Sequence, residues 1–235
     1  PYIKEKMDLD IQVQKLKLLK SNFLSEKYSL EDKIIKYYPQ RITSLENRIN
    51  GLTADVETAK QHPKPTDDRF VGMEVKGVFY SEKAEAGKAI IAACKEMTSP
   101  APVPLGRYRG FETELSFDTT ERFYCVTVKG ETGKQVSLGD DVFGNITRID
   151  NAVERFADDL EKAKDSLADT KNQFETAQKE VQKPFVQEEE LKSKLARLDE
   201  LNILLNMDKK ENEIVGGEPD EGESTEKRKE KSYER

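Results

Sequence analysis

Apolar residues recur along two long stretches of the chain at steps of four and three residues. In the clearer stretch, from Ile149 to Val181, nearly all the intervening positions are charged or polar. A sustained period of about 3.5 residues predicts a helix whose single apolar stripe is covered by another helix, as in a left-handed coiled coil. The stripe consists of Ile149, Val153, Phe156, Leu160, Ala163, Leu167, Thr170, Phe174, Ala177 and Val181.

A second stripe lies within residues 3–62. Its earlier half is looser, and Pro39 separates the halves. Because proline removes a backbone hydrogen bond and clashes with the preceding turn, we expect a kink or break at Tyr37–Pro39. Pro184 predicts a similar break after the first stripe, which resumes at Leu191. The regular half of the second stripe is Tyr38, Ile42, Leu45, Ile49, Leu52, Val56 and Ala59.

The residues between the two stripes alternate between apolar and polar positions, which is typical of strands with one buried face. Ser81 predicts a helix N-terminus, and the helix ends before Ser99. Residues 101–104 are interpreted as an extended linker. The sequence therefore predicts a small β-α-β-β-β domain over residues 67–139, with strands at 71–79, 111–117, 123–128 and 135–138.

Two helical arms, residues 1–62 and 140–208, flank this domain. We expect an α+β protein in which the arms form a long antiparallel coiled-coil hairpin with the small domain at its tip. Pairing of each arm with a second chain, in a parallel dimer, is the alternative. About 70 residues make a thin core, so the domain is expected to lean on the helix ends. Residues 209–235 lack apolar periodicity and are predicted to be a disordered charged tail.

Composition limits the classes of function. Charged residues make up 36% of the 235 residues, and the formal net charge of −7 argues against a general binder of polyanions. Two cysteines and one histidine exclude a Cys/His zinc site and a disulfide scaffold, and are typical of a reducing cytoplasm. No run reaches the roughly 20 apolar residues of a membrane span. The chain starts at Pro1, so we expect it to be part of a longer protein.

No residue set in the sequence points to catalysis, a cofactor, a metal or a small-molecule ligand. The run Gly130–Lys134 looks like a phosphate-binding loop, but its glycines are too close and Gln135 replaces the required Ser or Thr. We interpret it as a hairpin turn. His62 is interpreted as a helix cap rather than a catalytic group. Cys94 and Cys125 are interpreted as core residues rather than nucleophiles.

One cluster suggests contact with nucleic acid. In Arg107-Tyr108-Arg109 an aromatic ring lies between two guanidinium groups, a combination that can bind phosphate and stack on a base. The alternative is an ordinary exposed strand, because the domain holds slightly more acids than bases. A second basic cluster, Lys227–Lys229, lies in the predicted tail. Further candidate contacts on the same sheet are Arg122, Lys129 and Lys134.

Several stretches resemble one known family. They are Pro1–Lys20, Leu30–Pro39, Gly72–Gly77, Pro102–Phe111, Val136–Asn145, and Glu188–Lys192 with Leu201 and Asn202. In these stretches the chain resembles the C-terminal region of large fused adenine-specific DNA methylase and Swi/Snf-type helicase proteins of Gram-positive conjugative or integrative elements. The methylase and helicase motifs themselves do not occur here, so no catalytic residue is carried over.

The resemblance implies a non-catalytic accessory module that follows a helicase core in the bacterial cytoplasm. Its expected role is to position the helicase or methylase on DNA, or to dock a partner protein. The implied partners are DNA and the remainder of the parent protein, with no membrane. The alternative is a protein-interaction or oligomerisation arm that makes no contact with nucleic acid.

Overall fold

A computed structural model describes residues 2–67 and 69–215, with side chains up to residue 207. The chain divides into two units. One unit is Leu30–Gln182, and the other combines the residues up to Ser29 with those from Lys183 onward. The fold is α+β, with a long N-terminal helix, a six-stranded antiparallel sheet and further helices.

The sequence predicts a kink or break at Tyr37–Pro39. No break occurs, because helical residues run without interruption from Tyr2 to Gln61, but the regular α-helix gives way to a π-helical turn just before Pro39. The run consists of α1 (Tyr2–Asp32), the π-helical turn η1 (Lys33–Tyr37) and α2 (Tyr38–Gln61). Pro39 lies in the first turn of α2, directly after η1. The wider i→i+5 bonding of a π-turn accommodates the missing N–H, so the helix passes the proline without ending.

The sheet has the strand order β2-β1-β3-β4-β5-β6, and neighbouring strands are antiparallel. Three of the predicted strands, at 111–117, 123–128 and 135–138, correspond to β4, β5 and β6. The strands are β1 (Met73–Val75), β2 (Val78–Tyr80), β3 (Val103–Tyr108), β4 (Phe111–Asp118), β5 (Phe123–Lys129) and β6 (Lys134–Ser137).

Two parts of the predicted β-α-β-β-β order are wrong. The single strand expected at 71–79 is a hairpin, because Lys76 and Gly77 both have positive φ and form a two-residue turn between β1 and β2. The linker expected at 101–104 enters β3, where Val103 and Pro104 pair with β4. Pro102 and Pro104 are typical of a linker, but the chain forms β3 there, and β3 lies between β1 and β4 in the sheet.

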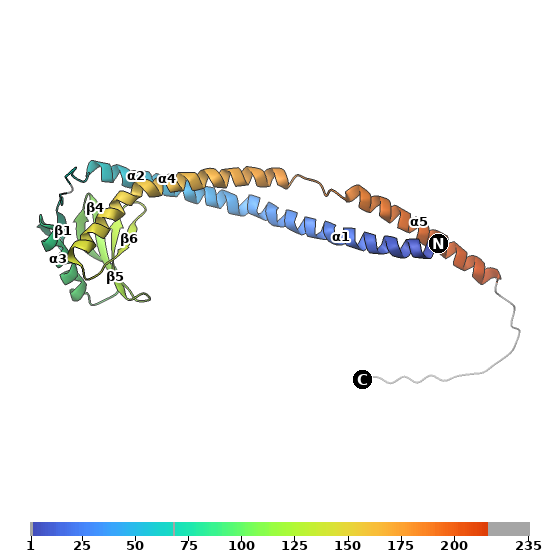
Figure 1. Ribbon diagram of the computed structural model, residues 1–235, viewed down its shortest axis with the longest axis horizontal. Coiled ribbons are helices and arrows are strands. Elements are labelled where there is room, and N and C mark those ends of the chain that lie inside the picture. The colour runs from blue at the N-terminus through green and yellow to red at the C-terminus, as the bar shows by residue number, and fades with distance from the viewer. Residues whose placement is uncertain (1, 68, 216–235) are drawn as a thin grey trace, which may run out of the picture. The chain divides into compact units, whose positions relative to one another are not determined.

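Helices α3 (Lys83–Glu96) and α4 (Val142–Glu180) pack against the sheet in the larger unit (Figure 1). The N-cap of α3 is Glu82 rather than Ser81. At the start of α4, the N-cap Asp141 accepts a hydrogen bond from the Phe143 amide at 3.1 Å. One core combines the sheet with both long helices. It includes Leu52 of α2, Ile90 of α3, Leu115 and Val126 of the sheet, and Ile149 and Phe156 of α4.

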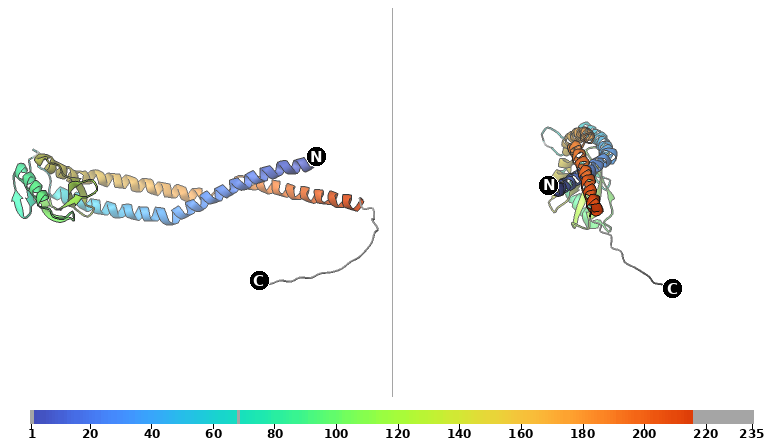
Figure 2. Two further views of the ribbon diagram at one scale, coloured as in Figure 1. Left: turned by 90° about the horizontal axis from the view of Figure 1, so that it is seen from below. Right: turned by 90° about the vertical axis from the view of Figure 1, so that its right-hand side faces the viewer.

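Helices α2 and α4 run side by side in opposite directions within this unit (Figure 2). Tyr38 stacks near Phe174 with ring centroids 5.5 Å apart, and further along α2 Glu46 pairs with Lys171 at 3.1 Å. Leu45 and Leu52, from the predicted stripe of α2, are buried. The apolar stripe predicted for α4 is likewise buried at Ile149, Val153, Phe156, Leu160, Ala163 and Ala177.

The predicted hairpin turn is confirmed, because β5 and β6 pair antiparallel on either side of it. This turn is also fixed to α2. The buried Asp55 carboxylate accepts hydrogen bonds from the amides of Glu131, at 2.6 Å, and Thr132, at 3.0 Å. Gly51 lies one helical turn earlier, and a Cβ there would lie 2.8 Å from Thr132 Cγ2. The glycine that weakens α2 locally therefore gives the turn room to approach the helix.

The smaller unit pairs the first part of α1 with α5 (Glu188–Val215). Val13 and Leu16 pack on Leu191 with Leu195 and Leu198 alongside. The break predicted at Pro184 is confirmed, since α4 ends at Glu180 and α5 begins at Glu188. The predicted tail, 209–235, overlaps the end of α5, while residues 216–235, including Lys227–Lys229, lie outside the described residues.

The shared core predicts how α2 contributes to stability. Leu52, 1% exposed, fills the space between the sheet and α4, so Leu52→Ala should lower the free energy of unfolding by about 2–5 kcal/mol. Leu18→Ala, at a position 62% exposed on α1, is the matched control and should change it by less than about 0.5 kcal/mol. Urea denaturation followed by circular dichroism measures both. Equal effects would contradict a core that includes α2.

Candidate functional site

A buried polar network joins the β3–β4 turn to both long helices. Arg109 occupies the turn with φ of +46°, and its side chain is 4% exposed. Its Nη1 donates to Asp150 Oδ1 at 2.9 Å and also pairs with Glu154, both on α4. Its Nε donates to the His62 carbonyl oxygen at 2.9 Å, at the end of α2. One guanidinium therefore holds three elements together.

Asp150 is the second centre of this network. Its Oδ1 also accepts from the Tyr108 hydroxyl at 2.9 Å, and its Oδ2 lies 3.2 Å from Lys64 Nζ. The two cations, Arg109 and Lys64, match the two carboxylates, Asp150 and Glu154. A buried charge without a partner is costly, whereas a matched and hydrogen-bonded set can be accommodated. The network accounts for the burial of the Arg109 and Asp150 side chains.

His62 ends α2, as its interpretation as a cap requires. Its amide donates to the Thr58 and Ala59 carbonyl oxygens, both at 3.2 Å, and its Nδ1 lies 3.1 Å from the Thr58 oxygen. The ring covers Gly110, where an added Cβ would lie 2.5 Å from Nδ1. The imidazole therefore packs on the β3–β4 turn.

The network shifts two pKa values. Burial raises the pKa of Tyr108 well above its usual range, and the nearby Asp150 carboxylate adds to this shift because it disfavours a second negative charge. Burial alone would lower the pKa of Arg109, but its hydrogen bonds to Glu154 and Asp150 outweigh that effect and raise it. Tyr108 is therefore a neutral donor and Arg109 a fixed cation.

These contacts correct the expectation for two candidate nucleic-acid residues. As whole residues, Tyr108 is 4% exposed and Arg109 is 8% exposed, so neither presents a surface on which a base can stack or a phosphate can bind. Their polar atoms are already used by Asp150, Glu154 and His62. At Tyr108 and Arg109, the side chains of the Arg-Tyr-Arg pattern stabilise the fold and do not form a binding surface.

The other candidate residues are not gathered into one basic surface. Arg107 is exposed and lies 3.4 Å from Glu112, and Lys129 pairs with Glu114 at 2.8 Å. Lys134 pairs with Asp159 of α4 and so lies on the helix-covered face of the sheet, opposite Lys129. Arg122 is exposed in the β4–β5 turn, where its φ is +58°.

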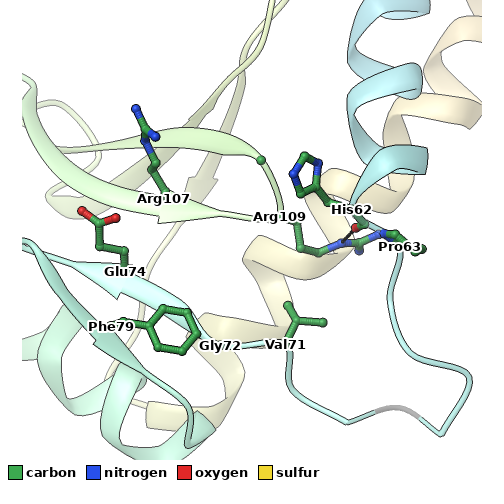
Figure 3. A pocket seen from close by; sticks show the side chains of 9 residues that line it. His62, Pro63, Val71, Gly72, Glu74, Phe79, Arg107 and Arg109 are labelled. Carbon is green, nitrogen blue, oxygen red and sulfur yellow. Dashed lines mark hydrogen bonds between the residues drawn. The ribbon is translucent and has the colours of Figure 1, made fainter.

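A pocket of about 350 Å³ lies at the outer end of the sheet, beside the network (Figure 3). It was not predicted, because its walls come from four separate segments. The Arg109 guanidinium closes one side at the His62 backbone, and the Phe79 ring lies near Gly72 and Val71 on another. Its principal lining residues are His62, Val71, Gly72, Glu74, Phe79 and Arg107.

Both cysteines are buried and form no disulfide, and Cys94 belongs to the main core cluster. Burial raises the pKa of Cys94 to about 11, and burial with the charge of Asp118 raises that of Cys125. A thiol with a raised pKa is a poor nucleophile at neutral pH. Over residues 2–67 and 69–215, no group of three or more His, Cys, Asp or Glu side chains is arranged to hold a metal.

The raised pKa of Tyr108 predicts an alkaline signature. Tyr108→Phe removes one hydrogen bond to Asp150 and should lower the free energy of unfolding at pH 8 by about 1 kcal/mol. The hydroxyl's contribution is complete below the unfolded pKa of about 10 and is lost as pH rises above it, because only the unfolded chain then ionises readily. Urea denaturation at pH 8 and pH 11 should show the difference shrinking, and a constant difference would contradict the network.

The burial of both thiols predicts slow modification. In the native chain at pH 8, an aromatic disulfide reagent should react with Cys94 and Cys125 only after unfolding. Absorbance of the released thiolate, with and without urea, measures this. A Ser25→Cys variant at an exposed position of α1 is the control and should react at once. Rapid native reaction of either natural cysteine would show that its site opens.

None of the described helices combines the length and the apolar character needed to cross a membrane. Comparison of the chain with protein-family models, with curated proteins and with solved structures finds no match.

Proposed function

We propose that the chain is a non-catalytic interaction arm that docks a partner protein at the outer end of its sheet, where the pocket lies. The pocket bounded by Glu74, Phe79 and Arg107 is the observation that carries this proposal. It combines a largely exposed aromatic ring with charged groups on a rigid sheet, the usual composition of a docking site. The aromatic and guanidinium groups that suggested nucleic-acid binding are mostly buried or paired with acids.

In this proposal, α2 and α4 form an antiparallel coiled-coil hairpin with the α+β domain at its tip. The facing stripes and the opposed directions of the two helices support it. The hairpin serves as a spacer that holds the docking domain away from the protein to which the chain belongs. The family resemblance suggests that this protein is a DNA helicase and adenine-specific methylase of the bacterial cytoplasm.

Direct positioning on DNA is the second candidate. Arg107 and Arg122 remain exposed and could contact phosphate groups. Two of the basic side chains on the sheet, Arg107 and Lys129, are each paired with a glutamate. This pairing argues against a large contribution of the sheet to DNA affinity. We therefore place protein docking first.

A crosslinking experiment tests the intramolecular hairpin. Glu46 and Lys171 form an ion pair between α2 and α4, so Glu46→Cys with Lys171→Cys should be joined within one chain by a short bismaleimide. Light scattering should give a monomer at all concentrations. Glu46→Cys alone is the control, and it should yield no crosslink. Crosslinked dimers from the double variant would support pairing between chains instead.

A binding series distinguishes protein docking from DNA positioning. A docking arm predicts no measurable affinity for duplex or single-stranded DNA in fluorescence anisotropy between about 50 and 200 mM salt. Steeply salt-dependent binding that Arg107→Ala with Arg122→Ala weakens, while the exposed Lys164→Ala does not, would contradict docking alone and establish the second candidate.

A further inference from the structure

One row of side chains crosses the face of the sheet that α3 and α4 do not cover, called here the open face. The row runs from the β2 edge of the sheet inward. The register places Phe79 of β2 opposite Glu74 of β1, and Glu74 opposite Arg107 of β3. Arg107 lies opposite Glu112, which lies opposite Lys129. The row therefore reads aromatic, negative, positive, negative, positive from the β2 edge of the sheet to β5.

The inner charges of the row are matched, but Glu74 is not. Arg107 turns to Glu112 at 3.4 Å, and Lys129 turns to Glu114 at 2.8 Å. The partly buried Glu74 carboxylate forms no ion pair or hydrogen bond within residues 2–67 and 69–215. A partly buried carboxylate without a partner favours a cation arriving from outside.

Phe79 gives that cation an aromatic surface next to Glu74. The ring is 66% exposed, yet it is held in place because it lies against Gly72, where an added Cβ would be 2.1 Å from Phe79 Cζ. Gly72 has φ of +88°, a conformation that glycine adopts without strain. A ring already positioned in this way loses little freedom when a ligand packs on it.

We propose that this pocket binds a lysine side chain of the partner protein, an inference that rests on the proposed docking function. The ammonium group lies against the Glu74 carboxylate and the face of Phe79, and the aliphatic stem lies along Val71. Aromatic rings and carboxylates together select ammonium groups by cation–π attraction and ion pairing. Arg107 lies next to Glu74 in the register but pairs with Glu112 at 3.4 Å. Its guanidinium points away from the Phe79 ring (Figure 3).

The edge position of β2 explains why a protein side chain, rather than a free amine, is the ligand. In the strand order β2 has a neighbour on one side only, so its outer edge can pair with an extended segment. A segment added there in register presents alternate side chains to the open face. A lysine on the added segment would then lie beside Phe79 and could reach Glu74.

An NMR titration of the full chain tests the proposal. The probe is a capped Val-Lys-Val tripeptide, with the same peptide carrying norleucine in place of lysine as the uncharged comparison. The lysine peptide should shift the amide signals of Gly72, Glu74 and Phe79, with a dissociation constant at least about tenfold lower than that of the norleucine peptide. Equal affinities, or no shifts at these residues, would overturn the proposal.

Two variants assign the site. Glu74→Gln should abolish the preference for lysine, whereas Glu114→Gln, a carboxylate on the same face paired with Lys129, should preserve it. Loss of the preference in both variants would contradict the assignment to Glu74. If Glu74→Gln fails to fold, the two peptides on the unaltered chain decide the question alone.

A third probe, n-butylammonium, separates the two sources of an ammonium group. Weaker binding than the lysine peptide supports a partner's side chain, and equal binding would overturn that source in favour of a free amine. Failure of the lysine preference removes this site only. Failure of the docking function itself appears separately, as salt-dependent DNA binding that Arg107→Ala with Arg122→Ala weakens.

Discussion

The buried pairing of Arg109 with Asp150 is the interaction on which the larger unit depends. It lies where the end of α2, the β3–β4 turn and α4 meet, and each of these elements supplies a group to it. Removing one member would leave the other charge buried with fewer partners, at a cost of about 3–5 kcal/mol. The pair also defines one wall of the pocket, because Arg109 is fixed against the His62 backbone (Figure 3).

Elements with strong periodicity were predictable from the sequence. The α4 stripe and the later half of α2 are helical as expected, and β4 to β6 lie where the alternation placed them. The errors fall where local chemistry competes with pattern. Pro39 is absorbed by a π-turn, and two prolines concealed β3. Lys76 has a positive φ that its residue type does not suggest, so the alternation over 71–79 predicts one strand where the chain forms the β1–β2 hairpin.

The side chains of the Arg-Tyr-Arg motif point in different directions, which the sequence alone does not indicate. Arg107, Tyr108 and Arg109 are consecutive, but the irregular register between Pro104 and Gly106 shifts the alternation, so Arg107 faces solvent and Tyr108 the core. Arg109 then falls in the turn and reaches inward to α4. The sequence Arg-Tyr-Arg is compatible both with an exposed strand that binds a ligand and with a buried ion pair that joins the strand to a helix. Only the position of α4 distinguishes them, and the pocket likewise depends on contacts between distant segments.

A double-mutant cycle on Arg109 and Asp150 tests this account most directly. Arg109→Met, Asp150→Asn and the double variant, compared with the unaltered chain by urea denaturation at neutral pH, give the coupling energy of the pair. A structural anchor predicts that each single change is strongly destabilising and that the two effects overlap by about 2 kcal/mol or more. Additive effects within about 0.5 kcal/mol would contradict the claim that this pair joins the sheet to its helices.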